Sequence, residues 1–261
     1  DLAQITEEHL KEHDQDHFGG LEANDILIAK AGIQAHHLVL DVCSGMGGPA
    51  RYFALRTGCR VVGLDFTESR LKSAEKLTAM VKLDDVVSFK LGNALEMPFE
   101  DDYFDVVIGQ EAWCHIPQKE KLIAQCTRVL KPGGVLAFTD ILRTDRISQA
   151  ELERLGQEMT FSDLGSIERY RALLTERGNE IAGVDDLSAL WADILVKRLA
   201  MYRSLKETTA RKFGEERHRE WDRYYSFFVG MYSEGKLGGA RFVARKRWDY
   251  APKLLKSAPF F

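Results

Sequence analysis

The chain has 261 residues, of which 45% are hydrophobic and 29% charged, enough for one large domain or one domain with a substantial insertion. Its 36 basic and 40 acidic side chains give a net charge of −4, a balance that gives no sign of a nucleic-acid surface, so no nucleic-acid partner is expected. No apolar run approaches the roughly 20 residues that span a bilayer, and the acidic N-terminus is unlike a signal peptide, so we expect no stable membrane insertion. Four scattered cysteines favour reduced thiols and a cytoplasmic location.

The N-terminal segment is polar and carries His9, His13 and His17. Their spacing would place the three rings on one face of a helix, where they could imitate a metal site. No further converging ligand is evident, so we predict no metal centre. A helix over about 21–30 then leads into the first strand.

The stretch that organises the chain is 38–50, with the sequence LVLDVCSGMGGPA. Its apolar start predicts a buried parallel strand, and its glycines predict a turn into a helix that opens near Pro49. Glycines let a ligand approach the backbone closely, and the N–H groups at a helix start attract negative charge. Because Gly45, Gly47 and Ala50 also fit the dinucleotide fingerprint, this motif alone leaves a nicotinamide enzyme open.

The next strand, over 60–66, ends in Asp65, an acid placed to bind the two hydroxyls of a ribose. Strands and helices then alternate, with Thr67 as an N-cap and 131–134 as a helix stop. The expected order is a helix over 50–56, a helix over 68–82, strands over 86–94 and 104–109, a helix over 119–130 and a strand over 135–142.

This alternation is typical of a doubly wound parallel sheet, whose ligands bind at the carboxyl ends of the strands. The polar candidates fall at those ends: Cys43 to Gly47, Asp65, Asn93, Gln110 to His115, and Asp140. This convergence predicts a ligand site there.

The pattern becomes mostly helical after the fifth strand. Helix is expected over 148–178, a sixth strand over 180–187, long amphipathic helices over 189–212 and 215–234, and a last strand over 240–246. With no repeat or low-complexity linker, the helices are expected to form a cap on the sheet.

From 38 to 246 the arrangement resembles the class I S-adenosylmethionine-dependent methyltransferases. The matching pieces are VLDVCSGMGGPARYFA, VVGLDFT, GNALEMPFEDDYFDVVIGQEAWCHI and RVLKPGGVLAFTD. HFGGLEA, QEAWCHIPQKEKL, SDLGSIERYRALLTERG and EGKLGGARFVARK are similar to sarcosine/dimethylglycine methyltransferases and their small-molecule relatives. The resemblance implies an α/β, Rossmann-like, seven-stranded and mostly parallel sheet, with the last strand antiparallel between the fifth and sixth.

It further implies a core over 37–147 and 179–246, a cap over 148–178 and 189–235, a tail over 247–261, and a segment over 1–36 that closes over the site. The implied cofactor is S-adenosyl-L-methionine. Gly45 and Gly47 would line its methionine part, Asp65 its ribose, Phe66 and Asn93 its adenine, and Gln110 its amino-acid end. The remaining implied cofactor residues are Asp41, Ser44, the Ala94 backbone, and His17 of the closing segment with its neighbour Phe18.

Methyl transfer from a sulfonium is an in-line displacement, which positioning and the exclusion of water can accelerate. An amine acceptor must be unprotonated, and Glu111 and His115 are the candidate catalytic groups. His115 can equally position the acceptor or hold structure. Trp113 is either a core aromatic or a wall for a methylated ammonium, and Asp140 can pair a cation or cap backbone N–H groups. Tyr170 is the further substrate-binding candidate.

The favoured hypothesis is an enzyme that methylates the nitrogen of a small amine or amino acid. The alternatives are carbon or oxygen methylation of a quinone-like, tocopherol-like or polyketide natural product, and a non-catalytic cofactor-binding protein. We expect a small-molecule methyl acceptor as partner, and a monomer or homodimer.

Overall fold

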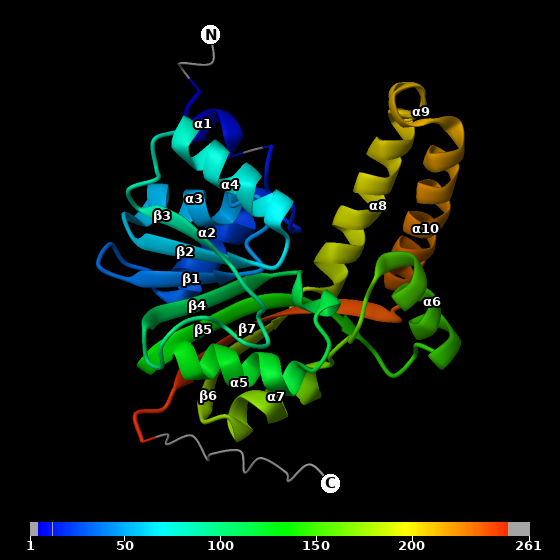
Figure 1. The fold of residues 1–261 in the computed structure, drawn as a ribbon. Coiled ribbons are helices and arrows are strands. Elements are labelled where there is room, and N and C mark those ends of the chain that lie inside the picture. The colour runs from blue at the N-terminus through cyan, green and yellow to red at the C-terminus, as the bar shows by residue number, and fades with distance from the viewer. Residues whose placement is uncertain (1–4, 12, 250–261) are drawn as a thin grey trace, which may run out of the picture.

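A single seven-stranded sheet forms the centre of the protein (Figure 1), in a computed structural model that describes residues 5–11 and 13–249. The strand order is β3-β2-β1-β4-β5-β7-β6. The strands are β1 (Leu38–Val42), β2 (Arg60–Asp65), β3 (Val87–Leu91), β4 (Phe104–Gln110), β5 (Leu130–Arg143), β6 (Asn179–Asp186) and β7 (Leu237–Lys246). β7 pairs antiparallel with both β5 and β6, and the other pairings are parallel. The predicted sheet, with its inserted antiparallel strand, is confirmed.

Helices cover both faces of the sheet. Figure 1 shows α1 (Glu7–Leu10), α2 (Gly20–Ala31), α3 (Gly48–Thr57) and α4 (Glu68–Met80) above it, and α5 (Lys119–Val129) and α7 (Ile167–Glu176) below. Leu27 and Phe53 enter one core cluster, and Leu122 and Tyr170 enter the other, on the far side. Each of these side chains is fully buried, and such burial contributes about 1.5–3 kcal/mol per large apolar side chain.

The remaining helices form a cap at one end of the sheet. They are α6 (Gln149–Met159), α8 (Ser188–Ser204), α9 (Lys206–Phe213) and α10 (Glu215–Ser233), and α8 and α10 project together from the sheet with α9 at their tip (Figure 1). Trp191 anchors α8 to β7 over Gly239, where a Cβ would lie 2.0 Å from the indole ring. A third core cluster fills the cap and includes Phe18 from the N-terminal segment.

Three features differ from the sequence-based expectations. β5 begins at Leu130, so the helix stop expected over 131–134 lies within this strand. The region 148–178 is not one helical cap, because α7 packs under the sheet beside α5, while 160–166 is not helical. The helix expected over 189–212 is divided at Leu205, where the Ser204 hydroxyl donates to the Met201 carbonyl at 2.6 Å. Such side-chain bonds compete with the helical backbone pattern. In the tail only 247–249 are described, and no described helix is long and apolar enough to cross a bilayer.

Candidate functional site

A cavity of about 930 Å³ lies at the carboxyl ends of β1, β2 and β4. Its wall includes most of the residues that the sequence placed in the site: His17, Asp41, Ser44, Gly45, Asp65, Phe66, Asn93, Ala94, Gln110, Glu111 and His115. Gly47, Trp113, Asp140 and Tyr170 are not among its lining residues. The expected convergence at one edge of the sheet is therefore present.

The glycine turn between β1 and α3 shapes one wall. Gly45 and Gly47 adopt positive φ of 56° and 79°, which glycine reaches without a Cβ penalty. A Cβ on Gly47 would lie 2.5 Å from the Phe89 ring, so this residue holds the turn against β3. Cys43 has φ of 69°, a conformation that disfavours side chains other than glycine, asparagine or aspartate. The chain therefore carries local strain at the mouth of β1.

Asp65 connects this turn to the next helix. Its Oδ2 accepts from the Gly45 N–H at 2.9 Å, and its Oδ1 accepts from the Thr67 N–H at 2.8 Å. The carboxylate is thereby held in one orientation at the end of β2. The neighbouring Phe66 ring is 77% exposed, which is unusual for a large aromatic residue.

Three polar side chains at the carboxyl ends of β1 and β4 each have a buried oxygen without a hydrogen-bond partner in the described structure. They are Asp41 Oδ2, Ser44 Oγ and Gln110 Oε1. Burial and the nearby Asp65 charge raise the pKa of Asp41 to about 7. Unpaired buried polar atoms are costly, and these three line one cavity. They are suited to receive the donor groups of a ligand.

Asn93 follows β3 on the opposite wall. Its Oδ1 accepts from the Leu95 N–H at 2.9 Å, which fixes the loop in which Ala94 is buried. The second lone pair of that oxygen and the amide N–H₂ both remain to contact a ligand.

Glu111 lies directly after β4, with φ of 49°. Its Oε1 accepts from the Thr139 hydroxyl at 2.7 Å, and its Oε2 accepts from the Phe18 N–H. Burial raises its pKa to about 7, against the opposing effect of these two donors. Both carboxylate oxygens are therefore engaged by the protein itself.

His115 stands at the rim of the cavity. Its Nδ1 lies 3.1 Å from the Thr160 carbonyl oxygen, so the tautomer consistent with this bond carries hydrogen on Nδ1 and leaves Nε2 as an acceptor. Partial burial lowers the pKa of His115 below its ordinary value. The ring is therefore mainly neutral near pH 7.

The other proposed substrate-binding side chains lie in the interior. Trp113 is fully buried and stacks on Phe138 with ring centroids 4.3 Å apart. Asp140 is also fully buried, and accepts from the Cys114 N–H at 2.9 Å and the Tyr170 hydroxyl at 2.7 Å. These contacts favour the core-packing and capping interpretations that the sequence left open. Asp140 and Tyr170 support the loop that carries His115 rather than line the cavity.

Several lining residues were not singled out from the sequence. Asp14 and Asp16 reach the cavity from the N-terminal segment, Arg70 from α4, and Thr160 from the cap. Asp16 and Arg70 form an ion pair at 3.3 Å. No local motif marks these residues, because each contacts the cavity only through tertiary folding.

The histidines of the N-terminal segment do not form a cluster. His9 Nδ1 lies 2.8 Å from the Thr6 hydroxyl, whereas His17 Nε2 lies 3.0 Å from Gln15 Oε1. Burial lowers the pKa of His17 to about 4, so this ring is neutral. Across residues 5–11 and 13–249, no group of three or more His, Cys, Asp or Glu side chains is placed to bind a metal.

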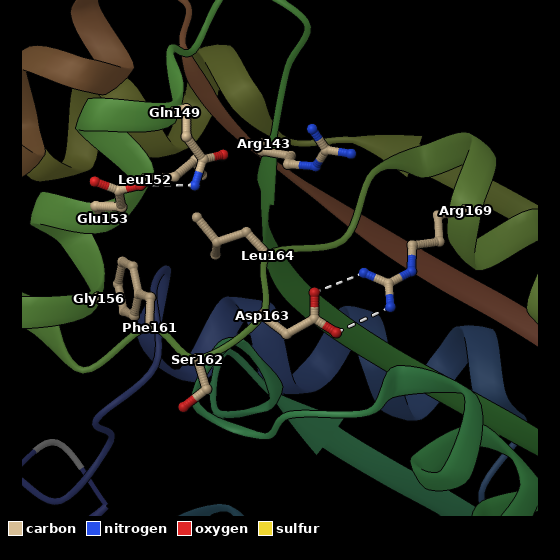
Figure 2. A pocket seen from close by; sticks show the side chains of 10 residues that line it. All are labelled: Arg143, Gln149, Leu152, Glu153, Gly156, Phe161, Ser162, Asp163, Leu164 and Arg169. Carbon is tan, nitrogen blue, oxygen red and sulfur yellow. Dashed lines mark hydrogen bonds and ion pairs between the residues drawn. The ribbon is translucent and has the colours of Figure 1, made fainter.

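A second, smaller cavity of about 500 Å³ lies on the outer side of the segment 160–164. Figure 2 shows Leu164 between the Asp163–Arg169 ion pair and the α6 residues Gln149 and Glu153. The Asp163 carbonyl accepts from the buried Lys119 ammonium at 2.5 Å. These bonds fix the segment whose Thr160 carbonyl orients His115.

Residues 40–138 match a family described as methyltransferase domain. This match identifies a methyltransferase domain over that part of the chain. The predicted family is thus confirmed, and the dinucleotide interpretation of the glycine turn is set aside.

Known relatives differ in the atom that their names say is methylated. A sterol 24-C-methyltransferase of Kluyveromyces lactis is 34% identical over 168 residues, covering 62% of this chain and 45% of that protein. A glycine/sarcosine/dimethylglycine N-methyltransferase of Actinopolyspora halophila is 30% identical over 190 residues, 73% of this chain and 34% of that protein. The chain therefore spans less than half the length of either relative.

A solved structure is similar over almost the whole chain. It is a putative sarcosine dimethylglycine methyltransferase from Galdieria sulphuraria, with a TM-score of 0.81 and 27% sequence identity. The match covers 88% of this chain and 86% of that one. The similarity thus includes the cap as well as the sheet.

Proposed function

We propose that the protein is an S-adenosylmethionine-dependent methyltransferase that methylates the nitrogen of a small amine or amino acid. Similarity to the N-methyltransferase from Actinopolyspora halophila supports this assignment. The observation that carries it is the acidic lining of the cavity, where Asp14, Asp16, Asp41, Asp65 and Glu111 outnumber the single arginine, Arg70. Asp14 and Asp16 are paired with Arg51 and Arg70, whereas Asp41 and Glu111, whose pKa values are raised to about 7, would ionise beside a bound cation. Such a wall attracts cationic ligands.

The residues present fit the proposed cofactor. The oxygens of Asp41, Ser44 and Gln110 that lack partners would accept from its ammonium group, and the Gly45 turn would lie along its methionine part. Asp65 would receive the ribose hydroxyls, and the exposed Phe66 ring would pack on the adenine. The Asn93 amide and the Ala94 backbone would contact the adenine edge. When bound, the cofactor supplies a methyl group carried on a positively charged sulfur.

His115 is the group that would accept the amine proton. Its neutral ring and the hydrogen bond from Nδ1 to Thr160 leave Nε2 free to take a proton. Glu111, whose pKa is raised to about 7, would ionise beside a cationic acceptor and favour it through the resulting negative charge. Since its two oxygens already accept from Thr139 and Phe18, it is less suited than His115 to remove a proton. Together these residues would hold and deprotonate the acceptor while the closed cavity excludes water.

Carbon methylation is the second candidate, because the sterol methyltransferase is 34% identical to this chain. Carbon methylation of an alkene produces positive charge on carbon, which a wall of carboxylates would also stabilise. The cavity wall, however, carries its apolar residues mainly beside the expected adenine and around Ala112 to Pro117. It is less suited to a large apolar acceptor than to a small cation.

Transfer of labelled methyl from S-adenosylmethionine to pooled acceptors tests the proposal. One pool holds small amines and amino acids, a second phenols and quinones, and a third sterols and other alkenes. Label in the first pool, lost in His115→Gln but retained in the surface variant Arg56→Met, supports nitrogen methylation. Label confined to another pool contradicts it, and binding of the cofactor without any transfer would indicate a non-catalytic protein.

A further inference from the structure

The N-terminal segment His13–Phe18, which we call the strap, crosses the cavity from the glycine turn to the cap. Asp14, Asp16 and His17 form part of the cavity wall. At its far end the Phe18 N–H donates to Glu111, and the Phe18 ring packs edge-on to Trp191 with centroids 5.1 Å apart. The strap therefore contacts both the core of the sheet and the cap.

The near end of the strap is held by Arg51 of α3. Its guanidinium is completely buried, with Nε 2.9 Å from Glu7 Oε2 and Nη2 paired with Asp14 Oδ2. Nη1 donates to the Met46 carbonyl at 2.9 Å and to the Thr78 hydroxyl at 3.2 Å. One planar group thus bonds both the strap side and the glycine turn, which a lysine could not reproduce.

The fit between strap and turn leaves no free space. A Cβ on Gly48 would lie 2.2 Å from the Asp14 carbonyl oxygen. A ligand that occupies this cavity is consequently covered by the strap on one side and by the sheet edge on the other. Movement of the strap would widen the exit for such a ligand, and the Arg51 ion pairs oppose that movement.

We propose that Arg51 is a positioning residue that keeps the strap closed over the cofactor and thereby sets how fast the cofactor leaves. This inference rests on the proposed function. Arg51 does not line the cavity, so it acts through Glu7, Asp14 and the Met46 carbonyl. When the guanidinium is removed, we expect the protein to keep its fold but to hold the strap less tightly. The buried carboxylates of Glu7 and Asp14 then lose their partner, so exposure to water becomes favourable for them.

Cleavage by trypsin measures strap opening. Lys11 is a trypsin site that lies in the sequence between Glu7 and Asp14, the two residues that Arg51 pairs with. Arg51→Met is expected to speed cleavage after Lys11 at least about tenfold, and to speed dissociation of S-adenosylhomocysteine by a similar factor. Arg56→Met, on the same helix but in an exposed ion pair with Asp25, is the matched control and should change neither rate. Bound S-adenosylhomocysteine should slow the cleavage of Arg51→Met and of Arg56→Met.

A folded Arg51→Met protein with both rates within about twofold of the original would overturn the inference. Should that variant not fold, Glu7→Gln removes one of the two ion pairs, and we expect it to raise both rates about threefold. Unchanged rates in Glu7→Gln would then overturn it. If the unsubstituted protein does not bind S-adenosylhomocysteine, the proposed function fails, while the trypsin comparison without ligand still tests the role of Arg51.

Discussion

The buried carboxyl of Asp41 predicts that cofactor binding releases a proton. Its pKa is raised to about 7 by burial and by Asp65, and its Oδ2 has no hydrogen-bond partner in the described structure. A cationic ammonium placed at that oxygen favours the ionised form and lowers the pKa. Binding below about pH 7 must therefore displace the proton first.

The size of the effect follows from the pKa. At about pH 6 roughly nine-tenths of the Asp41 carboxyls carry a proton, and at about pH 7 roughly half do. Binding should release about 0.9 and about 0.5 protons at these two pH values, and the dissociation constant should rise about fivefold on going from the higher to the lower. Both conditions lie below the roughly 7.7–8.0 at which an α-amino group loses its own charge.

Calorimetric titration with S-adenosylmethionine in two buffers of different ionisation enthalpy counts the released protons. Asp41→Asn should bind more weakly and lose most of this release. The control Asp140→Asn removes a buried carboxyl whose pKa is raised to about 6 but which does not line the cavity, and this variant should keep the proton release. Equal proton release from Asp41→Asn and the unsubstituted protein would refute the assignment of this oxygen to the cofactor ammonium.

Three further outcomes are expected. Because burial raises the pKa values of Asp41 and Glu111 to about 7, these carboxyls bind more protons in the folded state than in the unfolded state. The melting temperature of the unliganded protein should therefore fall as pH rises from about 4.5 to 7, and a flat calorimetric profile would contradict this. His115→Gln should lower kcat about 10²–10⁴-fold with little change in cofactor affinity, as steady-state kinetics can test. Gly48→Ala should weaken cofactor binding at least about tenfold by displacing the strap, and unaltered calorimetric affinity would count against that fit.

Local patterns in the sequence were sufficient to predict the first five strands and the gathering of polar residues at their carboxyl ends. β1 is an apolar run followed by the glycine turn, and β2 is an apolar run that ends in Asp65. The carboxyl ends of these parallel strands lie at the same edge of the sheet. Asp65 was predictable for this reason. The position of β7 came from the resemblance to known methyltransferases, since no periodicity within Leu237–Lys246 specifies its two antiparallel partners.

The strap and its anchors were not predictable from local patterns. Arg51 lies in a short helix between the buried residues Ala50 and Tyr52, and its own burial depends on partners that include Glu7 and Asp14, which are distant in sequence. Trp113 shows the opposite case. It is adjacent to cavity residues in sequence, yet the short helical turn Trp113–His115 directs its ring into the core against Phe138. The sequence alone therefore does not show which residues after a strand line the cavity and which pack into the core.

Glu111 connects closure of the strap to the acceptor side of the cavity. Its positive φ turns the side chain back, so that one oxygen accepts from Thr139 of β5 and the other from the Phe18 N–H of the strap. A cationic acceptor attracted to this carboxylate would meet two oxygens that each already accept one hydrogen bond while the strap is closed. Proton removal would then fall to His115, whose Nε2 makes no hydrogen bond within the described part of the chain. One residue would thus hold the closed state and the other perform the proton transfer.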